Sequence, residues 1–99
     1  MKLHYTAALT LTGWIIITPP HPNSVQQWET YSSRAPWSQW DIFKTFTSDE
    51  QRECMAEAKQ IRNDATNDLG AYGTAHLESL VLQQTRCVAA DDPRLQDEP

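Results

Sequence analysis

The sequence has no run of lysine and arginine. Eight Lys and Arg stand against thirteen Asp and Glu in 99 residues, which gives a formal net charge of −5 at pH 7. Nucleic-acid binding depends on cationic side chains that neutralise phosphates, so this composition argues against a nucleic-acid partner. The acids gather late in the chain, where we expect a solvated tail. They are Asp91, Asp92, Asp97 and Glu98.

Motifs for metal binding, catalysis and nucleotide binding are also missing. The three histidines, His4, His21 and His76, are scattered, and none has a recognised ligand spacing to another His, Cys or acid. We therefore name no metal ligand, no cofactor and no catalytic residue. The sequence gives no positive evidence that the chain is an enzyme.

Only two cysteines are present, Cys54 and Cys87, and they allow three interpretations. In an exported chain they pair, and closing a loop of about 34 residues removes denatured-state entropy worth roughly 3.7 kcal/mol. A redox pair is the second interpretation, although no C-x-x-C motif or cationic cluster is present to lower a thiol pKa. The third is a nucleophilic cysteine assisted by His76. We predict the disulfide, because so small a domain often needs a covalent link.

The start of the chain resembles a secretory leader, and its apolar stretch is too short to cross a bilayer comfortably. After a positive start, the stretch from Tyr5 to Thr18 carries no charge. In one interpretation this whole stretch is the signal. In the other, which we favour, residues 1–13 are a short leader and residues 14–18 form the first strand of the mature domain. Both predict a periplasmic or secreted protein, or a membrane-tethered one if the leader is not cleaved.

Hydrophobic patterning predicts one small α+β domain over residues 14–95, followed by a disordered tail at 96–99. We expect an antiparallel or mixed sheet of about three strands, with one or two helices on one of its faces. The expected strands lie near 14–18, 40–46 and 86–90, and the expected helices span 48–66 and about 75–85.

The helix at 48–66 has the strongest local evidence. Thr47 and Glu50 form a capping box before it, and Cys54, Ala58 and Ile61 then recur at helical spacing. The end of the chain is less determined, because Cys87 suits either a strand or the end of a second helix. An all-α hairpin is therefore the alternative fold.

Four tryptophans are an unusual number for a chain of this length. Large rings most often fill the core of a small domain, and we expect Trp40 and Phe46 to do so. A stacking surface for a sugar or a peptide is the other use, with Trp28, Tyr31 and Trp37 as its candidates. Trp28 lies in a polar stretch, and we expect it to be the most exposed of the four tryptophans.

Three segments carry motifs in a characteristic order. They are a tryptophan segment ending in Pro19-Pro20, a W…F…C stretch of Trp40, Phe46 and Cys54, and R-C-V-A-A-D-D-P-R-L at 86–95. This order resembles a group of small exported bacterial proteins of uncharacterised activity, whose last motif has the form R-C-[VI]-A-x-D-D-P-R-L. The resemblance spans residues 13–95 and implies a signal peptide, but it implies no activity.

These observations favour two kinds of function. One is a non-enzymatic exported module that binds a protein or supports an envelope component, with membrane contact only through an uncleaved leader. The other is a thiol-dependent redox protein or enzyme, which requires a reactive thiol at Cys54 or Cys87.

Overall fold

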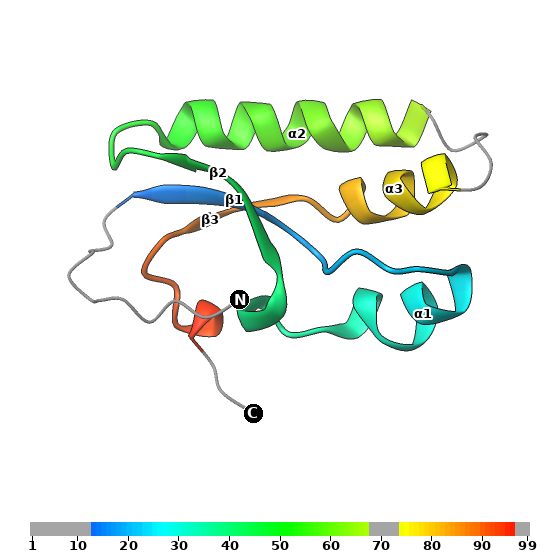
Figure 1. The fold of residues 1–99 in the computed structure, drawn as a ribbon. Coiled ribbons are helices and arrows are strands. Elements are labelled where there is room, and N and C mark those ends of the chain that lie inside the picture. The colour runs from blue at the N-terminus through cyan, green and yellow to red at the C-terminus, as the bar shows by residue number, and fades with distance from the viewer. Residues whose placement is uncertain (1–12, 68–73, 97–99) are drawn as a thin grey trace.

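Three strands form an antiparallel sheet in the order β2-β1-β3 (Figure 1). The strands are β1 at Trp14–Thr18, β2 at Asp41–Phe46 and β3 at Arg86–Ala89. The computed structural model describes residues 13–67 and 74–96, so all of the predicted leader except Gly13 and all of the predicted tail except Gln96 lie outside the described residues. The α+β class is confirmed. The all-α alternative is wrong, because Cys87 lies on a strand.

β1 is the central strand, and the core covers it on both faces. Ile15 and Ile17 belong to one buried cluster, together with Trp40, Val88 and Leu95. Ile16 belongs to a second cluster on the opposite face, with Cys54 and Ala58 of the long helix. A continuous apolar run suits such a strand, because neither of its faces meets solvent.

Helix α2 covers one face of the sheet and spans Gln51–Asn67 (Figure 1). It begins three residues later than predicted, because residues 48–50 form a turn that brings the Glu50 amide within 3.1 Å of the Thr47 carbonyl. Half of the predicted capping box is present, since the Glu50 carboxylate accepts a 2.8 Å hydrogen bond from the Thr47 amide. The Thr47 hydroxyl instead donates to Asp49, at 2.6 Å.

Helix α3, at Thr74–Leu82, packs beside α2 and leads into β3. Leu77 and Val81 are its buried apolar residues. The helix ends three residues earlier than predicted. It ends where the Gln84 and Thr85 amides turn back to the carbonyls of Val81 and Leu82.

The opposite face of the sheet is covered by the segment between β1 and β2. It contains helix α1 at Val25–Thr30 and two 3-10 turns, η2 at Ser32–Arg34 and η3 at Trp37–Gln39. Ser24 caps α1 by accepting from the Gln27 amide at 3.1 Å. A third turn, η4 at Pro93–Leu95, packs against η3.

Strand β2 does not have a simple two-residue alternation. Ile42 pairs with Ile17 and Lys44 pairs with Ile16, so Phe43 is an extra residue that forms a β-bulge. Ile42 and Phe43 remain 38% and 54% exposed. Trp40 precedes the strand and is buried as predicted, and its indole donates a 2.9 Å hydrogen bond to the Ala35 carbonyl.

Candidate binding surfaces

The two cysteines form a disulfide that joins α2 to β3. The Cα atoms of Cys54 and Cys87 lie 5.8 Å apart, within the range that a disulfide requires. Cys54 is fully buried, and Cys87 faces α2 because it pairs with Ile16 on the same side of the sheet. The predicted disulfide is confirmed. No cysteine of the chain is free, so this state has no thiol for His76 to activate.

The end of the last motif attaches η4 to η3. Both oxygens of Asp92 accept hydrogen bonds from the Arg94 guanidinium, at 3.0 and 2.8 Å, and Asp92 also caps η4. The guanidinium lies 3.9 Å from the centre of the Trp37 ring, while Leu95 is fully buried in the core. We had expected Asp92 to belong to a solvated tail. That expectation is wrong, because its carboxylate is held by Arg94. Its hydrogen bonds from Arg94 hold the pKa of this carboxyl below its ordinary value.

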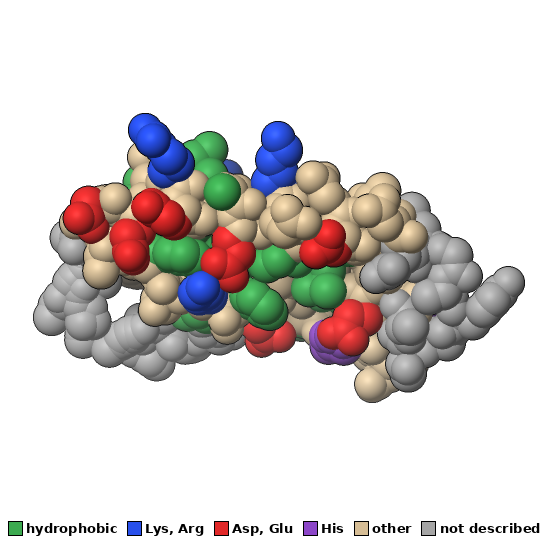
Figure 2. Space-filling view, turned by 90° about the horizontal axis from the view of Figure 1, so that it is seen from above, with side chains coloured by type: hydrophobic (Ala, Val, Ile, Leu, Met, Phe, Trp, Pro, Cys, Tyr) green, Lys and Arg blue, Asp and Glu red, His purple; other side chains and the backbone are tan. Residues whose placement is uncertain are grey.

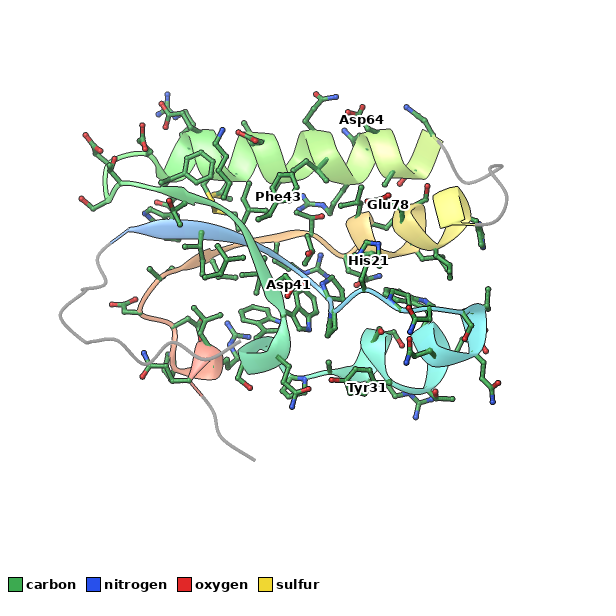
Figure 3. The ribbon with its side chains drawn as sticks, in the orientation of Figure 1. His21, Tyr31, Asp41, Phe43, Asp64 and Glu78 are labelled. Atoms are coloured by element: carbon green, nitrogen blue, oxygen red, sulfur yellow. A yellow bond between two sulfur atoms is a disulfide. The ribbon has the colours of Figure 1, made fainter. Side chains whose placement is uncertain are left out.

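The three aromatic candidates do not form one exposed stacking surface. Trp28 is only 9% exposed, which contradicts the expectation that it is the most exposed tryptophan; it is the buried residue of α1. Trp37 is half-buried between Arg94 and Trp40, whose ring centre is 6.1 Å away. Tyr31 is 48% exposed and its hydroxyl donates to Gln39 at 2.7 Å; Figure 3 shows it at the rim near α1. The ring of Tyr31 is thus the accessible member of the set.

Helix α2 separates its charges by sign. Helical spacing places Glu53, Glu57 and Asp64 on the side toward β2, where Glu57 forms a 2.9 Å ion pair with Lys44. Figure 2 looks down on this helix and shows acidic side chains along one side of it, with a cation among them, and further lysine and arginine along the other side. The cationic side chains are those of Arg52, Lys59 and Arg62.

The cationic side of α2 borders a shallow hollow of about 960 Å³. Arg52, Lys59 and Arg62 line it, together with Met55, which is 54% exposed. Asp49 and Glu53 also line the hollow, near the start of α2. Positive charge therefore dominates farther along the helix.

At that far end, two arginines from different elements converge on one carbonyl oxygen. Arg62 of α2 and Arg86 of β3 donate to the Thr85 oxygen at 3.0 and 3.2 Å. No carboxylate of the described residues forms an ion pair with either guanidinium. The sequence analysis missed this pair, because its members are 24 positions apart and only the sheet and the disulfide bring them together.

Two further kinds of feature, a metal site and a membrane-spanning helix, are not found among the described residues. Within residues 13–67 and 74–96, no three His, Cys, Asp or Glu side chains gather to hold a metal ion. None of the helices in this part of the chain combines the length and apolar character needed to span a bilayer. Comparisons with protein-family models, curated proteins and solved structures found no match.

Proposed function

We propose that this protein is an exported, disulfide-linked module, periplasmic or secreted, that binds a protein or supports an envelope component and catalyses no reaction. The disulfide between Cys54 and Cys87 is the observation that supports this most directly. Disulfides persist in oxidising compartments and are rare in the reducing cytosol.

The placement of the disulfide favours a structural use over a redox use. A redox protein needs a sulfur that another thiol can reach and attack. Cys54 is fully buried, and its cluster with Ile16 and Ala58 lies at the centre of the contact between α2 and the sheet. Opening this bond would expose part of the core.

The test uses the full chain expressed with its own N-terminus in a bacterium with a periplasm. Intact cells are treated with a thiol-alkylating reagent before lysis and fractionation, and the mature protein is analysed by mass spectrometry and N-terminal sequencing. We expect a protein outside the cytoplasm with both cysteines oxidised and unreactive. An uncleaved N-terminus in the membrane fraction would indicate a tethered form of the same module.

Two results would contradict the proposal. A cytoplasmic protein with two free thiols would remove its basis. An exported protein whose disulfide is reduced rapidly by thioredoxin in the folded state would instead favour the thiol-dependent redox function.

A further inference from the structure

We infer that the cationic side of α2, with Arg62 and Arg86 as its anchor, binds an acidic peptide segment of a partner protein. This inference rests on the proposed function and specifies the chemistry of the partner.

The anchor consists of two guanidinium groups held at one point. Thr85 is fully buried, and its carbonyl fixes one N–H of Arg62 and one of Arg86. Each guanidinium has five N–H donors, so most donors of both groups remain available. Two like charges side by side repel each other. A bound carboxylate relieves that repulsion and accepts hydrogen bonds from both guanidinium groups.

The disulfide between Cys54 and Cys87 fixes the elements that carry the two arginines. Arg86 is the neighbour of Cys87, whose disulfide ties β3 to α2. Arg62 lies two helical turns beyond Cys54 on the same helix. The anchor is therefore preorganised, which lowers the conformational entropy that the two arginine side chains lose when a ligand binds.

The remaining cations extend the anchor in one direction. Lys59 and Arg52 follow Arg62 along the hollow, and the ten residue steps from Arg52 to Arg62 span about 15 Å. A row of this length suits a single extended chain of several residues that carries more than one carboxylate. Met55 adds an exposed apolar contact in the middle of the row.

A peptide fits these observations better than an anionic membrane surface. A flat bilayer laid on α2 would also meet the acidic side of the same helix, including Asp64 (labelled on α2 in Figure 3). The whole chain carries a net charge of −5, which an anionic bilayer repels. Met55 is the only large apolar side chain of α2 that is well exposed, so little could insert among lipids.

The test measures binding of a fluorescein-labelled ten-residue glutamate peptide to the oxidised full chain by fluorescence anisotropy. A ten-residue glutamine peptide is the ligand control. We expect binding of the glutamate peptide at about 20 mM salt that weakens steeply by 200 mM, since exposed charges are then screened. The glutamine peptide should not bind.

Single substitutions locate the site. We expect Arg62→Gln and Arg86→Gln each to weaken binding by about tenfold, the loss of one charge-assisted contact of about 1.4 kcal/mol. Arg34→Gln removes the same charge from an exposed position in η2 and should change binding less than twofold. Arg86 is itself exposed, so its variant keeps the test valid if the half-buried Arg62→Gln protein unfolds.

Three results would overturn the inference. The first is no binding of the glutamate peptide at low salt. The second is an equal loss of peptide affinity in the Arg34→Gln and Arg86→Gln variants. The third is binding to phosphatidylglycerol vesicles that needs Arg86, in a protein that does not bind the peptide. Each of them leaves the proposed function intact, because that function is tested by compartment and thiol state.

Discussion

At the scale of single residues, Gly13 occupies a position where the backbones of two strands approach closely. A Cβ atom added there would collide with the Phe46 carbonyl oxygen of β2, and the Gly13 carbonyl accepts a 2.9 Å hydrogen bond from Ala90. Backbone atoms cannot move aside as a flexible side chain can. We expect Gly13→Ala to destabilise the fold by about 1–3 kcal/mol, the usual effect of overpacking.

Urea unfolding of the Gly13→Ala protein measures this effect. Ser33→Ala, at an exposed position in η2, is the control and should leave the midpoint unchanged. A Gly13→Ala midpoint equal to that of the control would show that the approach of the two strands is not as close as described.

Trp40 has a different role, since it combines a large buried ring with a polar contact. It is 6% exposed and donates to the Ala35 carbonyl at 2.9 Å. Trp40→Ala should cost roughly 3–5 kcal/mol through the cavity it leaves. Trp40→Phe keeps an aromatic ring but leaves the carbonyl without its donor, which should cost about 1–3 kcal/mol. Thermal unfolding distinguishes the two variants, and a fully stable Trp40→Ala protein would exclude a core role.

At the scale of elements, the turn η4 contains an ion pair between Asp92 and Arg94. Hydrogen bonds from Arg94 lower the pKa of Asp92, so this carboxyl binds its proton more weakly in the folded protein than in the unfolded chain. Its contribution to stability is therefore complete above the unfolded pKa and is lost as the pH falls through the lower, folded pKa. The effect is modest, because Arg94 is 65% exposed and solvent screens the pair.

Asp92→Asn removes this titration while keeping the size of the side chain. We expect the native protein to lose more stability between pH 5 and about pH 2 than the variant does. Chemical denaturation at several pH values checks this, and parallel pH profiles for the two proteins would contradict it. Asp91→Asn, one residue away and exposed, is the matched control.

The elements that the sequence predicted are those whose signals are local. Three successive isoleucines indicated β1, and Cys54, Ala58 and Ile61 at helical spacing indicated α2. The elements that it missed depend on distant partners. Helix α1 has only six residues, so its stability comes from burying Trp28 rather than from its own pattern. The bulge at Phe43 likewise depends on the pairing with β1, which composition does not reveal.

The candidate sites divide in the same way. The disulfide could be predicted because the chain has two cysteines and a leader-like start. The aromatic surface could not be judged from composition, since the burial of Trp28 and the covering of Trp37 by Arg94 are tertiary contacts. The convergence of Arg62 and Arg86 was equally hidden, because a helix and a strand contribute one residue each.

At the scale of the whole molecule, stability depends on two small clusters on opposite faces of one sheet. The disulfide lies in the cluster under α2, where it joins the long helix to an edge strand. A chain of this size has little apolar area to bury, so a link that restricts the unfolded chain makes a large relative contribution. The other cluster, around Trp40 and Leu95, has no covalent link.

Replacing both cysteines by serine should therefore lower the free energy of unfolding by about 2–5 kcal/mol. The measurement is urea unfolding of the native protein with and without prior reduction in denaturant, beside the Cys54→Ser/Cys87→Ser variant. Reduction should shift the unfolding midpoint of the native protein toward that of the variant. It should leave the midpoint of the variant unchanged, which controls for effects of the reductant. Equal midpoints for the oxidised and reduced proteins, with reduction verified by mass, would mean that the two clusters suffice and that the disulfide contributes nothing to stability.

The loss of stability should fall mainly on the α2 side, because the disulfide lies there. Amide exchange should then rise first in α2 and β3, while the indole of Trp40 keeps its protection.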